Sequence, residues 1–147
     1  MIGAYVMRQA DLQTNRTKAD SIAMGSYNSD SHNIQRIITA EGFVRNEGDM
    51  QVGVKPYQIP YRIMLPKRNE ARNLLVPVAF SASHVAYSSV RMEPQYMMIG
   101  QAAGDTAALA IKSGMPVGKV DIAALQEKLR SQHAILHIEQ EAKERAR

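Results

Sequence analysis

The sequence predicts an α/β chain, or an α+β chain if it is a fragment, because strand-like segments come first and helical segments come last. Short apolar stretches separated by turn residues occupy about the first 80 positions, whereas a long helical pattern covers residues 94–113 and a shorter one follows Asp121. Strands gathered before helices suit an α+β chain, or the C-terminal part of an α/β protein.

Five strand segments are expected within the first 65 residues. They are residues 1–10 (Tyr5 and Met7 on one face, Val6 on the other), Ser21–Tyr27, Ile34–Thr39 paired with Gly42–Arg45, and Tyr57–Leu65. Gly25 indicates a close backbone approach within its strand. The polar stretches between them predict loops or turns at residues 11–20, 28–33 and 46–53. The prolines in and around 57–65 keep that strand at an edge or break it.

A short buried strand is expected over Leu74–Phe80, although Pro77 weakens it. A polar loop with His84 and Tyr87 is expected next, before the long helix. Pro94 near the first turn and Gly114 just past the end suit the start and the end of that helix. Its small residues recur at helical spacing and predict a face packed closely on a sheet: Gly100, Ala103, Gly104, Ala107, Ala108 and Ile111.

A second helix is expected from an Asp121 cap through about Arg130, with Ile122, Leu125 and Leu129 on one face. The tail over residues 139–147 is highly charged and suits a frayed or solvated end.

Composition excludes several classes of protein. Of 147 residues, 45% are hydrophobic and 22% charged, as in ordinary globular chains. The net charge of +4 is small and scattered, which argues against nucleic acid as a partner. The lack of cysteine excludes disulfides, thiolate metal sites and thiol nucleophiles within the chain. No apolar run of about 18 residues is present, so no membrane span is expected.

The start of the long helix is the first candidate binding feature. The first-turn N–H groups and the positive dipole end beside Arg91, Met92 and Glu93 favour an anionic oxygen, from a phosphate or from an electron-rich ring carbonyl.

Four segments resemble the C-terminal part of the FAD-dependent oxidoreductase family, a group sometimes labelled xanthan lyase and distantly similar to the flavin subunit of heterodisulfide reductase. They are DSHN (30–33), YQIPYRIMLPKR (57–68), NLLVPVAFSASHVAYSSVRMEP (73–94) and IGQAAGDTAALA (99–110). The resemblance implies a dinucleotide-binding domain that is split in sequence by a substrate domain. Residues 1–67 would then belong to the strand-rich substrate domain and residues 68–120 would close the FAD-binding domain. Residues 121–147 would form a C-terminal helix and charged tail.

The same resemblance implies FAD as cofactor and an oxidoreductase activity on a small-molecule substrate. Ser89, Arg91, Met92 and Glu93 would be the cofactor-binding residues, with the helix start aimed at the N1–C2=O edge of the ring. Reduced flavin gathers negative charge there, and a helix N-terminus stabilises such charge by roughly 0.3–2 kcal/mol. Glu93 has the alternative role of simply favouring the positive end of the helix.

Catalytic and substrate residues are expected nearby. A flavin enzyme that oxidises an alcohol or similar C–H bond needs a base near the flavin N5, which suits His84, with Tyr87 and His32 as further catalytic candidates. Asn33, Tyr61 and Arg62 are the substrate-binding candidates. The alternatives are a structural hydrogen bond for His84, a local turn for residues 30–33, and an ion pair within the chain for Arg62. No metal site is expected.

One departure from the family is large. The nine glycines stand at 3, 25, 42, 48, 53, 100, 104, 114 and 118, and no three have the G-x-G-x-x-G spacing that holds the FAD pyrophosphate. The chain is therefore expected to be a C-terminal fragment that needs the missing N-terminal half of the same enzyme as its partner. It is expected to bind no FAD alone. The alternative is a non-catalytic accessory or interaction domain derived from such an enzyme.

Overall fold

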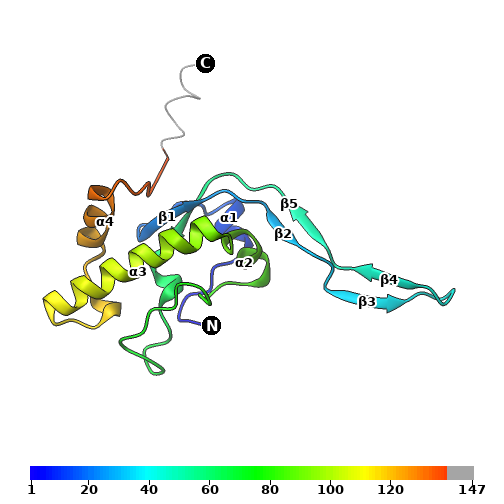
Figure 1. Cartoon of the computed structure of the whole chain (residues 1–147), viewed down its shortest axis with the longest axis horizontal. Coiled ribbons are helices and arrows are strands. Elements are labelled where there is room, and N and C mark those ends of the chain that lie inside the picture. Colours follow the sequence, from blue (N-terminus) through cyan, green and yellow to red (C-terminus); the bar gives the residue numbers. More distant parts are fainter. Residues whose placement is uncertain (139–147) are drawn as a thin grey trace, which may run out of the picture.

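The computed structural model describes residues 1–138, which form a helix-covered body and a long two-stranded arm (Figure 1). At the centre of the body, β1 (Ser21–Gly25) pairs antiparallel with β6 (Tyr57–Pro60), so that Ala23 lies opposite Ile59 and Gly25 opposite Tyr57. The long helix α3 (Glu93–Ser113) packs on β1. Both helices and antiparallel strands are present, which confirms the mixed α/β class.

The predicted strand at 21–27 and its close approach at Gly25 are confirmed. A Cβ added at Gly25 would lie 2.7 Å from the Tyr57 ring, closer than packed atoms come. The predicted strand at 57–65 is correct only as far as Pro60. There the chain turns into the 3-10 helix η1 (Tyr61–Met64), because proline has no N–H with which to continue the ladder.

The arm consists of two successive strand pairs and extends away from the body (Figure 1). β2 (Ser29–Ser31) pairs with β5 (Met50–Val52), and β3 (Gln35–Ile38) pairs with β4 (Val44–Glu47). The pairing of 34–39 with 42–45 is confirmed. The turn predicted over 28–33 and the loop predicted over 46–53 are wrong, because the two segments pair with each other and continue the ribbon. Gly48 lies between β4 and β5 with a φ of +86°, a conformation that suits glycine.

The N-terminal segment departs from the predicted strand. Met7 forms a single bridge with Ala82, and α1 (Gln9–Gln13) follows, across the end of the predicted strand and the start of the predicted loop. The Asp11 carboxylate accepts a 2.7 Å hydrogen bond from the Arg8 backbone N–H and pairs with the Lys18 ammonium at 3.0 Å. Burial alone would raise the pKa of Asp11. The hydrogen bonds from Arg8, Tyr5 and Lys18 outweigh the effect of burial and lower the pKa of Asp11. The carboxylate therefore stays charged in the first turn of α1.

Two expectations about residues 74–90 are also wrong. Leu74–Phe80 is not a buried strand: Leu74 and Val78 are exposed and the segment has no regular structure. Pro77 lacks an N–H, and no strand in residues 1–138 lies beside this segment to pair with it. His84 and Tyr87 lie on a short helix, α2 (His84–Val90), rather than in a loop, because the Ser83 side chain caps it by accepting from the Ala86 N–H.

Helix α3 is confirmed with its predicted ends, including the left-handed cap at Gly114 (φ +64°). The face that it buries is not the small-residue face. The buried positions recur every three or four residues: Gln95, Ile99, Ala102, Thr106 and Ala110. Gly104, Ala107 and Ala108 are exposed, Ile111 is 83% exposed, and a Cβ on Gly100 or Gly104 would meet no atom within 4 Å. The expected close packing of this face is therefore absent from the described residues.

The last described helix, α4 (Ile122–Ser131), agrees with its prediction. The Asp121 carboxylate accepts from the Ala123 N–H at 2.9 Å, and Leu125 and Leu129 are buried toward α3 and β1. The short 3-10 helix η2 (Val117–Lys119) connects α3 to it. The charged tail expected over 139–147 lies outside the described residues. Within the described part, no helix is long and apolar enough to cross a membrane.

A buried chain of hydroxyl groups ties β6 to α2 and to the end of β1. The Tyr57 hydroxyl lies 2.6 Å from Ser89 Oγ, and Ser89 Oγ donates its proton to the Tyr27 carbonyl. Because a serine hydroxyl has one proton, Tyr57 must be the donor to Ser89. Burial raises the pKa of Tyr57 to about 12, so the phenol keeps this proton throughout the neutral range.

Replacement by alanine should change the free energy of unfolding in opposite directions at Gly25 and Gly100. Gly25→Ala should lower the free energy of unfolding by about 1–3 kcal/mol, because its methyl group overlaps the Tyr57 ring. Gly100→Ala should raise it by about 0.5–1 kcal/mol, because the helix gains propensity and the methyl group meets nothing. Urea unfolding of the two variants checks both signs, and destabilisation by Gly100→Ala would contradict the open helix face.

Removal of the Ser89 hydroxyl should also lower stability. Ser89→Ala leaves the Tyr57 hydroxyl and the Tyr27 carbonyl without their partner, at a cost of about 1–3 kcal/mol. In a double-mutant cycle with Tyr57→Phe, the two effects should be non-additive. Ser131→Ala is the matched control, because that hydroxyl is exposed and bonds the Lys128 carbonyl within its own helix. Equal decreases in the free energy of unfolding for Ser89→Ala and Ser131→Ala would argue against a structural role of the Ser89 hydroxyl.

Candidate functional site

The base of the arm and helix α2 together enclose a cavity of about 420 Å³, here called the His84 cavity. It brings together segments about fifty residues apart, and α2 packs on β2. Five of the residues predicted for catalysis or binding line it, namely His32, Asn33, His84, Tyr87 and Arg91, and Asp30, Ser31, Ile34 and Ser88 complete it. The sequence prediction that residues 30–33 and 84–91 serve one site is therefore consistent with their placement.

Hydrogen bonds orient His84 in this cavity. Its Nε2 lies 3.0 Å from Ser31 Oγ, and the Ser31 hydroxyl donates to the His32 carbonyl at 3.3 Å. In the arrangement where the Ser31 proton is directed there, Ser31 accepts from His84 and a neutral imidazole carries its proton on Nε2. The lone pair is then on Nδ1, which no group within residues 1–138 engages. Because the His84 side chain is exposed, Nδ1 is free to take a proton from a bound molecule.

Arg91 and Tyr87 define the side of the cavity that continues into α3. The Arg91 guanidinium donates to the Asp30 carbonyl at 3.0 Å, which ties β2 to the junction of the two helices. The Tyr87 hydroxyl lies 2.7 Å from that of Tyr96. Burial, followed by the hydrogen bond to Tyr87, raises the pKa of Tyr96 to about 12. The Tyr96 phenol is therefore a neutral hydrogen-bonding group near neutral pH.

A second hollow, of about 530 Å³, opens at the start of α3 and is here called the helix-start cavity. Met92 and Glu93 line it from the helix, and residues 24–27 line it from the end of β1. No side chain caps α3, whose N-cap residue is Met92. Because Pro94 has no N–H, the first-turn donors beside this open space are the N–H groups of Glu93 and Gln95, which suit an anionic or electron-rich oxygen.

Three predicted site residues lie outside both cavities. Ser89 is buried in the hydroxyl chain described above. The Tyr61 hydroxyl is buried and donates to the Val117 carbonyl at 2.7 Å. Arg62 pairs with Asp20 at 3.2 Å and lies over the Tyr5 ring at 4.3 Å from its centroid. For Arg62 the structure therefore has the alternative arrangement, an ion pair with a carboxylate of its own chain.

Sequence reasoning missed Ser31, which orients His84, and the backbone of Asp30, which holds Arg91. Both residues stand within the DSHN segment, so the signal was present in the motif, although their roles depend on the pairing of β2. Among the described residues, no group of three or more His, Asp or Glu side chains is arranged to hold a metal ion.

The described residues fit one end of FAD rather than all of it. An uncapped helix start beside a hollow suits the ring edge that gathers negative charge. In contrast, no glycine triplet in the chain has the spacing that binds the pyrophosphate. The fit is therefore to the flavin end of the cofactor.

Comparison with known proteins identifies the family of the chain. A family model described as FAD dependent oxidoreductase matches residues 1–129. No curated protein and no solved structure matches the chain. Because the family model covers most of the sequence, the chain belongs to the FAD-dependent oxidoreductase family.

Proposed function

We propose that this chain closes the flavin site of an FAD-dependent oxidoreductase and supplies part of its substrate site. One observation carries the proposal: consecutive residues of the chain line the two cavities. Arg91 lines the His84 cavity and Met92 lines the helix-start cavity. A ring in one hollow would thus lie close to a small molecule in the other. FAD, when bound, supplies the acceptor for the electron pair that leaves the substrate.

In this proposal the helix-start cavity is the cofactor side. Met92 and Glu93 lie at its wall, and the N–H groups of Glu93 and Gln95 at the start of α3 would hold the N1–C2=O edge of a bound flavin. The positive helix end stabilises negative charge at that edge. Ser89 acts indirectly, by holding the Tyr27 carbonyl at the opposite wall.

The His84 cavity is the substrate side. His84 takes a proton from the substrate through Nδ1, while Ser31 holds the ring through Nε2. His32, Asn33 and Tyr87 line the same space and offer hydrogen bonds that orient a polar small molecule. Arg91, anchored on Asp30, adds a positive charge at the boundary between the two cavities.

We also propose that the pyrophosphate-binding half is supplied by another polypeptide segment. Two features support this: the chain lacks a G-x-G-x-x-G loop, and the small-residue face of α3 is open. Met97 is 75% exposed on that face, and the Cβ positions of Gly100 and Gly104 meet no neighbour. Small side chains let a neighbouring backbone approach closely, as a sheet does when it packs on a helix.

A non-catalytic interaction domain is the second candidate. It is favoured by the apolar side chains exposed along the arm, of which Ile38 is 78% exposed, since an exposed apolar ribbon is typical of a surface that binds another protein. Flavin binding and turnover separate the two candidates.

The role of His84 is tested in the flavin-loaded enzyme. His84→Ala should lower kcat/KM by about two to four powers of ten, because the proton acceptor is lost. His137→Ala is the control, since that histidine is exposed and lies in neither cavity. Turnover that survives His84→Ala would refute the base assignment.

Flavin binding is tested by co-purification. The 147-residue chain alone should carry no stoichiometric flavin, whereas co-expression with the segment encoded immediately upstream should give a complex with flavin absorbance. Gly104→Leu should abolish that complex by filling the open face of α3, and Ala123→Leu on the exposed side of α4 should leave it intact. Stoichiometric flavin on the chain alone would overturn the two-part site. Absence of flavin from the co-expressed pair would favour the interaction domain.

A further inference from the structure

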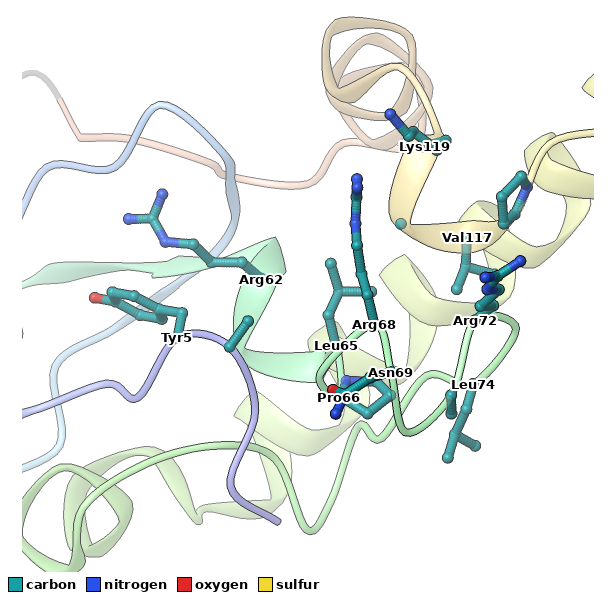
Figure 2. A pocket seen from close by; sticks show the side chains of 14 residues that line it. Tyr5, Arg62, Leu65, Pro66, Arg68, Asn69, Arg72, Leu74, Val117 and Lys119 are labelled. Carbon is teal, nitrogen blue, oxygen red and sulfur yellow. The ribbon is translucent and has the colours of Figure 1, made fainter.

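A third cavity, of about 740 Å³, shares no residue with the other two and has a different chemical character (Figure 2). Three segments build it: the N-terminal strand-like segment at Ala4 and Tyr5, the chain that follows η1, and residues 116–119 around η2. These segments are fixed against one another. A Cβ on Gly3 would lie 2.3 Å from the Leu65 carbonyl oxygen, and the Tyr61 hydroxyl holds the Val117 carbonyl at 2.7 Å.

The floor of this cavity is apolar. The side chains that form it come from two of the three segments: Figure 2 labels Leu65, Pro66, Leu74 and Val117, and Pro116 also lines the cavity. Gly118 contributes no side chain, which leaves the space above η2 open. A floor of this kind buries the face of a ring or a short aliphatic body.

The rim is cationic, and no acidic residue lines the cavity. Arg62 is already neutralised by Asp20. Arg68, Arg72 and Lys119 have no ion pair or side-chain hydrogen bond with any residue of 1–138, whereas the neighbouring Lys67 pairs with Glu70. Figure 2 shows Arg68 and Arg72 on the loop that follows η1 and Lys119 on η2, so two separate segments supply the three cations.

We propose that this cavity binds an organic anion that combines an apolar, ring-sized body with a phosphate or carboxylate group. Guanidinium forks match the oxygen geometry of both groups. Because all three cations are exposed, and exposed ion pairs contribute little by themselves, an inorganic ion alone would bind weakly. The apolar floor supplies the rest of the affinity. The proposal is independent of the flavin site, since the two share no residue.

The test uses the 147-residue chain and four probes: 1-naphthyl phosphate, 1-naphthoate, 1-naphthol and inorganic phosphate. Calorimetric titration should give saturable binding of naphthyl phosphate or naphthoate, at least about tenfold tighter than naphthol or inorganic phosphate. The aromatic anion that binds more tightly shows whether the cavity prefers a phosphate or a carboxylate group. Equal affinity for naphthol, or for inorganic phosphate alone, would overturn the proposal, as would the absence of saturable binding by both aromatic anions.

Charge-matched variants locate the site. Arg68→Gln with Arg72→Gln should weaken binding by about tenfold or more, because two charge-assisted contacts are lost. Lys112→Gln with Lys128→Gln removes the same charge from exposed positions outside the cavity and should change the affinity less than twofold. Leu74→Ser, at a side chain 49% exposed on the floor, should weaken the aromatic anions and leave inorganic phosphate unchanged. Equal losses in the two double variants would show binding by net charge alone and contradict the site.

Discussion

The buried hydroxyl of Tyr57 is the contact on which the arrangement of the rest depends. It donates to Ser89, which donates to the Tyr27 carbonyl, so one chain of hydrogen bonds joins β6, α2 and the end of β1. The ring of Tyr57 occupies the space that Gly25 leaves open on the opposite strand. A larger residue at 25 would displace the ring, and with it the helix that carries His84.

This contact explains why polar groups from distant segments meet. With α2 fixed on the strand pair, its N-terminal end lies against β2, where Ser31 reaches His84 and the Asp30 carbonyl reaches Arg91. The two helices α2 and α3 follow each other with only Arg91 and Met92 between them. The His84 cavity and the helix-start cavity are therefore neighbours, because consecutive residues of the chain line them.

Much of the fold was predictable because its signals are local. Gly114 ends α3, Asp121 caps α4, and Pro60 ends β6, each through a property of one residue. The errors fall where pairing partners decide the structure. Residues 28–33 and 46–53 have the composition of turns, yet they form strands because each supplies the partner of the other. Leu74–Phe80 has the composition of a strand, yet no strand of the described structure pairs with it, and Val76 donates instead to the Met64 carbonyl of η1.

By itself, the sequence determined the class of the chain, the boundaries of α3 and α4, the family motifs and the two segments, 30–33 and 84–91, that line the His84 cavity. Tertiary structure alone decided which side chains enter that cavity. Ser89 and Tyr61 lie near the predicted site in sequence but are buried in structural hydrogen bonds, and Arg62 is neutralised by Asp20. It also decided that α3 buries Ile99 and leaves Ile111 open. The physical reason is that burial and hydrogen-bond partners are properties of the packed chain, whereas propensity and capping are properties of neighbouring residues.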